Sequence, residues 1–237
     1  MARKKIIFVI VEGPSDDEAL GVLLEKIFDS NRVFVYITHG DITTESGVTK
    51  NNILTKIGNA IKAYACSNHL TKTHFLKIIH ILDMDGAYIP ENAVVFDPHF
   101  QKPYYTENVI RTANVNGIRT RNHRKSEILD KISSTDTIWG IHYQAYYMSC
   151  NLDHVLYGKL NSSDEDKERD AHAFAKKYIH DIPAFKSFIT SSTFSVRGNY
   201  RQSWKYIAEN KHSLERHTNL GICLTYPRAS PWDSREV

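Results

Sequence analysis

The sequence has 237 residues, of which 41% are hydrophobic and 24% are charged, and its formal net charge is +3. This composition is that of an ordinary globular chain, and no apolar run approaches the roughly 18 residues of a membrane span. The three cysteines, Cys66, Cys150 and Cys223, are too far apart for a zinc site or a disulfide framework. We therefore expect a cytoplasmic protein with reduced thiols and no membrane partner, whose slightly basic charge permits a nucleic-acid partner.

The chain begins with a predicted strand and a predicted helix that are joined by an acidic turn. Residues 6–11 form an apolar run typical of a buried strand, and the turn at residues 12–15 leads into an amphipathic helix. Ser15 is the expected N-cap, with Glu18 at the N3 position of a capping box. Glu12 then lies at the carboxyl end of a strand, which is where open α/β sheets place their chemistry.

Strands and helices continue to alternate. Residues 32–38 predict a second strand, residues 51–65 a helix, and residues 75–82 a third strand that ends in Asp83-Met84-Asp85-Gly86. This order implies right-handed crossovers and therefore a parallel sheet covered by helices. Asp41 lies just past the second strand, so acidic residues follow three strand ends that should meet at one edge of the sheet.

The second half of the chain is less regular. Residues 87–118 contain many turn formers, and a polar link at 162–166, in which Ser163 and Asp166 can cap a helix, interrupts the later elements. We expect a helix at 121–132, a strand at 138–149, a helix from 151, a helix up to about 179, mainly helical structure at 184–209, a last strand or buried segment at 219–226, and a poorly ordered tail from 228.

The predicted fold class is therefore α/β, with a Rossmann-like parallel sheet flanked by helices. Residues 1–160 form the predicted catalytic domain. Residues 161–237 form a mainly helical C-terminal elaboration, either separate from that domain or part of it.

The acidic strand ends point to metal chemistry. Asp83 and Asp85 are two residues apart, so on an extended chain their side chains point the same way. Two carboxylates that point together repel unless a cation lies between them. Oxygen-rich sites of this kind suit Mg²⁺ or Mn²⁺, and these metals support phosphoryl chemistry.

The sequences V-E-G-P-S-D at 11–16 and I-L-D-M-D-G at 81–86 together resemble the TOPRIM domain. Topoisomerases, bacterial primases and the OLD-family (overcoming-lysogenisation-defect) nucleases share this domain, and the resemblance covers residues 5 to about 90 and, more loosely, up to 160. It implies a TOPRIM-like sheet in which Glu12, Asp83 and Asp85 are catalytic and bind metal. As in OLD-like nucleases, it also implies that Asp16 is a metal ligand.

The resemblance implies a Mg²⁺-dependent endonuclease that hydrolyses phosphodiester bonds of DNA or RNA, tRNA included. The chain leaves little room for the nucleophilic-tyrosine domain of a topoisomerase and lacks the zinc module of a primase. It contains no G-x-x-x-x-G-K-[ST] motif, so an ATPase would be a separate partner, as in bacterial anti-phage defence systems. A homodimer is also compatible with the resemblance.

Further candidate residues fall into two groups. Asp41 and the strand-to-helix junction at Asn151 and Asp153 are second-tier site residues. Two basic groups, at 111–131 and 197–216, suggest contacts with a nucleic-acid backbone. In the second group three basic residues recur at every fourth position, as on one helical face, among aromatic residues that can stack on bases. The candidates for nucleic-acid binding are Arg121, Arg124, Lys125, Arg197, Arg201 and Lys205.

Other interpretations of the same residues stay open. A non-catalytic subunit could use the TOPRIM scaffold to hold a partner ATPase. I-L-D-M-D-G also resembles the first motif of haloacid-dehalogenase-type phosphatases, although Ala87 stands where those proteins usually carry Thr or Ser, and two strands precede the motif. Glu12 can be a solvent-facing turn acid, and helix capping alone is a sufficient explanation for Asp16.

Overall fold

The computed structural model describes residues 4–29 and 31–225. Its centre is a five-stranded sheet in the order β2-β1-β3-β8-β7. The first four strands are parallel, and β7 pairs antiparallel with β8. The strands are β1 (Ile6–Val11), β2 (Arg32–Ile37), β3 (Phe75–Asp83), β7 (Thr137–Ile138) and β8 (Ile141–Met148). The predicted α/β class and the parallel arrangement of the strands are confirmed.

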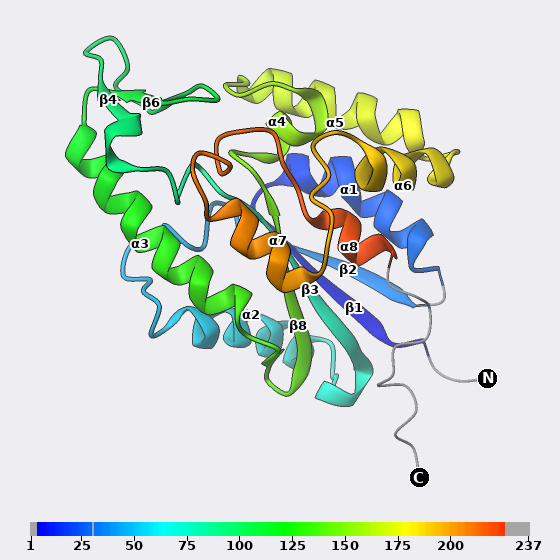
Figure 1. Ribbon diagram of the computed structural model, residues 1–237. Helices are drawn as coiled ribbons and strands as arrows, with labels where there is room; N and C mark the ends of the chain where they lie inside the picture. Colours follow the sequence, from blue (N-terminus) through cyan, green and yellow to red (C-terminus); the bar gives the residue numbers. More distant parts are fainter. Residues whose placement is uncertain (1–3, 30, 226–237) are drawn as a thin grey trace.

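Helices cover both faces of this sheet (Figure 1). Both faces of β1 are buried, with Ile7 and Val9 in one apolar cluster and Phe8 and Ile10 in the other, which explains its unbroken apolar run. The face of Val9 is covered by α1 (Pro14–Ile27), α4 (Leu152–Tyr157), α5 (Asp164–Tyr178), α6 (Ile182–Ser191) and α8 (Leu220–Thr225). The other face is covered by α2 (Ile53–Ser67), α3 (Val115–Ser133) and α7 (Tyr200–Ile207).

A second, small sheet lies beside the beginning of α3 (Figure 1). Its strands are β4 (Val94–Phe96), β5 (Tyr104–Tyr105) and β6 (Ile110–Thr112), in the order β4-β6-β5, and short 3₁₀ turns at Lys72–His74 and Glu91–Ala93 precede β3 and β4. The strands are only two or three residues long. Because a period of two residues cannot be recognised in so short a run, this region showed no strand pattern in the sequence.

The first helix begins differently from the prediction. Gly13 is the N-cap and Pro14 occupies the first helical position, which suits its fixed φ and missing N–H. The carboxylate Oδ2 of Asp16 accepts hydrogen bonds from the backbone N–H groups of Glu12 and Gly13 at 3.1 Å and 2.9 Å. Asp16, and not Glu18, therefore makes the capping contacts, and Ser15 is not the N-cap.

Three later elements also differ from the prediction. The predicted strand at 138–149 is a hairpin, because Trp139 and Gly140 both have left-handed φ angles and turn the chain between β7 and β8. The helical stretch at 184–209 is broken into α6 and α7. The segment from 219 forms the buried helix α8, and the tail from 228 lies outside the described residues.

The C-terminal helices share their core with the main sheet. Phe174, Phe185 and Leu220 belong to the apolar cluster that contains Val9 and Leu20. The residues after 160 therefore contribute to both faces of the sheet, with α5, α6 and α8 on the face of Val9 and α7 on the other. None of the described helices is both long and apolar enough to cross a membrane.

Candidate functional site

Acidic residues from three adjacent strands lie at the carboxyl edge of the sheet. Glu12 directly follows β1, Asp83 ends β3, and Asp41 comes shortly after β2. The carboxylate Oε1 of Glu12 accepts a hydrogen bond of 3.0 Å from the backbone N–H of Asp83. This bond connects the two acidic motifs across the sheet and holds the side chain of Glu12 toward the end of β3.

Glu12 and Asp83 are in an environment that disfavours two negative charges. Burial raises the pKa of Glu12, and the negative charge of Asp41 raises it further. Burial also raises the pKa of Asp83, and the negative charge of Glu12 is the largest source of repulsion. The carboxylate of Asp83 has no hydrogen-bond or ion-pair partner among residues 4–29 and 31–225. A positive charge at this position would stabilise both carboxylates.

A second pair of carboxylates already has its cation. Lys125 on α3 is fully buried, and its Nζ lies 2.7 Å from Asp41 Oδ2 and 2.6 Å from Asp85 Oδ2. Burial favours the neutral amine, but the two carboxylates outweigh it and raise the pKa of Lys125. Burial would likewise raise the pKa of Asp41, yet the adjacent ammonium lowers it to about 2. The charged forms of Lys125 and Asp41 therefore support each other, and Asp85 provides the second ion pair of the ammonium group.

Asp85 does not extend the strand that ends at Asp83. Its φ is 49° and that of Gly86 is 70°, so the chain turns at once through the left-handed region. Asp85 Oδ1 accepts a hydrogen bond of 3.3 Å from the hydroxyl of Tyr105 on β5. The sequence predicted that Asp83 and Asp85 point together at one cation. The structure differs, because Tyr105 contacts one carboxylate oxygen of Asp85 and Lys125 contacts the other.

Arg121, one helical turn before Lys125, holds this second pair in place. Its guanidinium donates hydrogen bonds to the hydroxyl of Tyr105 at 2.7 Å and to the backbone carbonyl of Asp85 at 2.8 Å. Arg124 on the same helix donates to the backbone carbonyl of Thr44 in the loop after β2. Three of the predicted nucleic-acid-binding residues therefore contact groups of the chain itself.

Lys125 is the clearest correction to the sequence prediction. Its side chain is 0% exposed, so it does not present its charge to a ligand at the surface. The spacing of Arg121, Arg124 and Lys125 places them on one side of a helix. This spacing was the signal in the sequence that could have indicated that all three contact the same part of the protein. Tyr105 was missed because nothing in its surroundings indicated a strand that reaches the site.

The second-tier residues have different surroundings: Asp41 pairs with Lys125, whereas Asp153 lies near Asp16. Asn151 is the N-cap of α4, where its side chain accepts a hydrogen bond of 2.8 Å from the backbone N–H of His154 and donates one of 3.1 Å to the carbonyl of Leu160. Asp153 is buried. Burial raises the pKa of Asp16 to about 6, and the charge of Asp153 contributes to this increase. Asn151 thus has a structural role, whereas Asp153 adds negative charge beside Asp16.

The second basic group differs from the predicted helical stripe. Arg197 precedes α7, separated from it by Gly198 with a φ of 108° and by the N-cap Asn199, so only Arg201 and Lys205 lie on the helix. Trp204 is buried, with its ring centroid 5.2 Å from that of Tyr147, and so is unavailable for stacking on a base. The three basic side chains are themselves exposed.

The carboxylates do not form a ready-made metal centre. Across residues 4–29 and 31–225, no three His, Cys, Asp or Glu side chains converge as a metal ion would require. What the edge provides is an unpaired acidic pair, Glu12 and Asp83, next to a pair that Lys125 neutralises. Comparison of the chain with protein-family models, with curated proteins and with solved structures gave no match.

Proposed function

We propose that the protein is a metal-dependent nuclease that hydrolyses phosphodiester bonds of DNA or RNA. The observation that supports this proposal best is the pair Glu12 and Asp83, two half-buried carboxylates at the carboxyl edge of a parallel sheet. Such an edge is the usual ligand-binding position of an open α/β sheet. Neighbouring carboxylates that repel each other and have raised pKa values are typical of functional sites.

The available donors suit Mg²⁺ or Mn²⁺. Both ions prefer oxygen ligands, and Mg²⁺ commonly binds through one or two carboxylates while it keeps several waters and contacts substrate phosphates. Glu12 and Asp83 would hold the ion, since one carboxylate oxygen of Glu12 and both of Asp83 are without a partner among the described residues. A bound divalent ion would supply an activated water and stabilise charge on the scissile phosphate. Two protein ligands are enough for this role, so the lack of a three-residue centre is compatible with it.

The other residues would keep the two ligands in position. The backbone N–H of Asp83 orients the carboxylate of Glu12, and Asp16 fixes the turn that carries Glu12 by accepting the N–H groups of Glu12 and Gly13. In this role Asp16 supports the site through the backbone. Lys125 pairs with Asp41 and Asp85 and so offsets negative charge that a phosphate would otherwise meet. Preorganised charges of this kind need no rearrangement during the reaction.

The finer parts of the proposal rest on the motif resemblance. V-E-G-P-S-D and I-L-D-M-D-G resemble the TOPRIM motifs of OLD-family nucleases, and the sheet that joins them is of the Rossmann-like type. On this basis we propose a TOPRIM nuclease that acts as the effector of an anti-phage system together with a separate ATPase. DNA and RNA, including tRNA, are both candidate substrates.

Substitution of Glu12 tests the proposal. Glu12→Gln keeps an acceptor for the N–H of Asp83 but removes the charge that a metal requires, so Mg²⁺-dependent cleavage of single-stranded DNA, duplex DNA or RNA should fall by at least roughly a hundredfold. Glu18→Gln, on the exposed side of α1, is the matched control and should cleave like the parent protein. Thermal unfolding checks that both variants and the parent protein are folded. Equal cleavage by folded Glu12→Gln and by the parent would refute the catalytic assignment.

Two observations favour a second candidate function. Lys125 already satisfies Asp41 and Asp85, and no metal centre is preformed among the described residues. Both facts are compatible with a non-catalytic subunit that binds a partner ATPase. This alternative predicts no metal dependence and no growth arrest when the protein is overproduced. The nuclease hypothesis instead predicts growth arrest together with degradation of DNA or RNA, and it predicts that Glu12→Gln abolishes both effects.

A further inference from the structure

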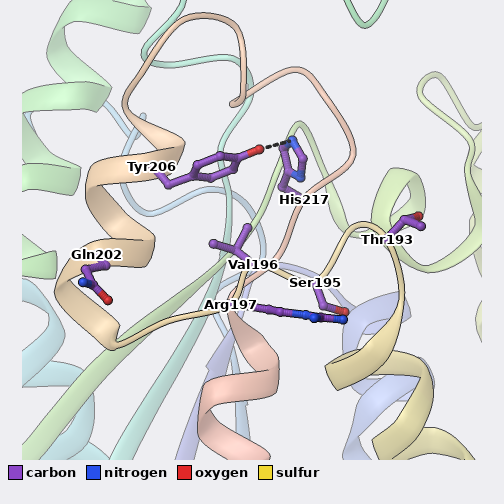
Figure 2. Close-up of a pocket in the computed structure, with 7 residues that line it drawn as sticks. All are labelled: Thr193, Ser195, Val196, Arg197, Gln202, Tyr206 and His217. Carbon is purple, nitrogen blue, oxygen red and sulfur yellow. Dashed lines mark hydrogen bonds between the residues drawn. The ribbon is translucent and has the colours of Figure 1, made fainter.

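A cavity of about 510 Å³ lies between α7, the loop that precedes it and the segment before α8 (Figure 2). Figure 2 shows Tyr206 and His217 on one side of the cavity and Arg197 on the other. The hydroxyl of Tyr206 lies 3.2 Å from Nε2 of His217 and closes that side. The lining residues are Thr193, Ser195, Val196, Arg197, Gln202, Tyr206 and His217.

The lining offers hydrogen-bond donors and no carboxylate. The guanidinium of Arg197 and the hydroxyl of Thr193 make no hydrogen bond or ion pair with residues 4–29 or 31–225. Gln202 Oε1 accepts a hydrogen bond of 3.1 Å from Asn199, which leaves its NH₂ group free to donate. Glu215, which is not among the lining residues, contacts His217, with Oε2 3.3 Å from Nε2. Exposed Arg201 and Lys205 on α7 add positive charge nearby. A phosphate matches this set of donors, since the guanidinium can bind it in a bidentate manner.

The cavity lies on the same sheet edge as the acidic site. Ser195 is bridged to Thr218, Thr218 is bridged to Met148, and Met148 is the register partner of Asp83. Hydrogen-bonded strands are about 4.8 Å apart, so these three steps place Ser195 roughly 15 Å from Asp83. His217 is held to the same edge by a hydrogen bond of 2.7 Å from its backbone N–H to Oγ of Ser149, the residue after β8.

We propose that this cavity binds a backbone phosphate of the nucleic-acid strand whose scissile phosphate lies at Glu12 and Asp83, an inference that rests on the proposed function. Arg197 is the principal contact, with Gln202 and Thr193 as neutral donors. Successive phosphates of one strand are at least about 3.4 Å apart along the helix axis, so roughly 15 Å corresponds to about four nucleotides or fewer. Arg197 is thus a substrate-binding residue outside the acidic site.

Equilibrium binding tests this inference separately from cleavage. The anisotropy of fluorescein-labelled oligothymidine, and of its uridine RNA counterpart, is measured without divalent metal, so that no hydrolysis takes place. Arg197→Gln should weaken binding by about tenfold or more, as expected for a lost charge-assisted hydrogen bond. Arg201→Gln removes another exposed arginine, one that does not line the cavity, and should weaken binding less than about threefold.

Other results of the binding experiment would contradict the inference. Equal weakening by the two variants would mean a diffuse basic surface, and unchanged binding by Arg197→Gln, or no binding by the parent protein, would mean that no strand enters the cavity. Competition by adenosine monophosphate as effective as that by the unlabelled oligonucleotide would assign the cavity to a free nucleotide instead. If Arg197→Gln selectively weakens binding while the parent and Glu12→Gln are equally inactive in cleavage, the proposed nuclease fails and the cavity assignment stands.

Discussion

Lys125 carries a positive charge inside the protein, where an unpaired ammonium group costs several kcal/mol. The structure compensates this cost with two carboxylates, Asp41 and Asp85, each within 2.7 Å of Nζ. The triad joins three parts of the chain that surround the acidic edge: the loop after β2, the turn after β3, and α3. A single side chain thereby determines which carboxylates at this edge are neutralised internally and which remain available.

Replacing Lys125 should therefore destabilise the protein strongly. Lys125→Met leaves the half-buried carboxylates of Asp41 and Asp85 without their cation, and we expect a loss of about 3–5 kcal/mol in the free energy of unfolding. Urea denaturation measures this loss. Lys131→Met, at an exposed position of the same helix, is the control and should change stability by less than about 0.5 kcal/mol. A loss of less than about 1 kcal/mol for Lys125→Met would show that the triad contributes little.

His80 gives the protein a predictable response to acid. Burial lowers the pKa of its imidazole from 6.5 to about 4, and its Nδ1 lies 2.8 Å from the hydroxyl of Tyr143. Because the unfolded chain binds a proton below about pH 6.5 and the folded chain does so only near pH 4, the contribution of His80 to stability is complete above pH 6.5 and is lost as the pH falls toward 4.

Removing this imidazole should reduce the loss of stability in acid. Between pH 7 and pH 4 the parent should lose on the order of 3 kcal/mol more than His80→Gln, from about 1.4 kcal/mol per pKa unit. Glu12 and Asp83, whose pKa values are raised, respond with the opposite sign, and Asp41, whose pKa is lowered, responds with the same sign, but all three are present in both proteins and cancel in the difference. Urea denaturation at several pH values measures it, with exposed His142→Gln as the control. Identical pH profiles for the parent and His80→Gln would contradict the buried neutral imidazole.

At the scale of elements, the turn between β3 and the small sheet positions Asp85. Gly86 has a φ of 70° and lies in a tightly packed position, where an added Cβ would come within 2.8 Å of Leu214 Cδ2 and 3.1 Å of Ile110 Cδ1. Gly140, in the β7–β8 turn, has nearly the same φ of 71° but open space around it, with the nearest atom at 4.0 Å. A comparison of alanine substitutions at the two glycines therefore distinguishes the cost of backbone strain from the cost of steric contact.

Alanine at these two positions should give different losses of stability. Gly140→Ala should cost about 1–2 kcal/mol, which is the strain of a left-handed alanine. Gly86→Ala carries the same strain and should cost a further 1–3 kcal/mol or so because of the contacts with Leu214 and Ile110. Thermal unfolding of both variants measures the difference. Equal losses would mean that the side chains around Gly86 can move aside freely.

At the scale of the whole molecule, the C-terminal helices complete the core of the sheet. Phe174, Phe185, Ile189 and Leu220 are buried against β1 and α1. Burial of each such side chain contributes roughly 1.5–3 kcal/mol, so together they approach the 5–15 kcal/mol or so by which a whole domain is usually stable. We therefore expect residues 1–160 to lack a self-sufficient core, which favours the alternative that residues 161–237 are part of the same domain.

A fragment of residues 1–160 should accordingly fail to fold alone. We expect it to lack near-ultraviolet circular dichroism and a cooperative urea transition, because the face of the sheet that contains Val9 would keep α1 and α4 but lose α5, α6 and α8. The full chain, measured in parallel, should show one transition. A cooperative transition in the fragment would instead identify residues 1–160 as an independent domain.

Much of the architecture follows from local sequence. Unbroken apolar runs indicate the buried strands, and alternation with amphipathic segments indicates a parallel sheet. Since the carboxyl ends of parallel strands meet at one edge, the sequence also predicts that Glu12, Asp41 and Asp83 lie near one another, as they do. The start of α1 and the nature of α8 were less predictable, because short segments fit more than one pattern.

The sequence by itself determined the sheet, its acidic edge and the residue types available there, because these depend on local pattern and strand direction. Only the tertiary structure decided how the charges pair. Lys125 is 84 residues from Asp41 and 40 from Asp85 along the chain, and no local rule predicts which distant cation enters a cluster of carboxylates. That pairing leaves Glu12 and Asp83 as the unneutralised acids, because the charge of Lys125 is already shared between two other carboxylates.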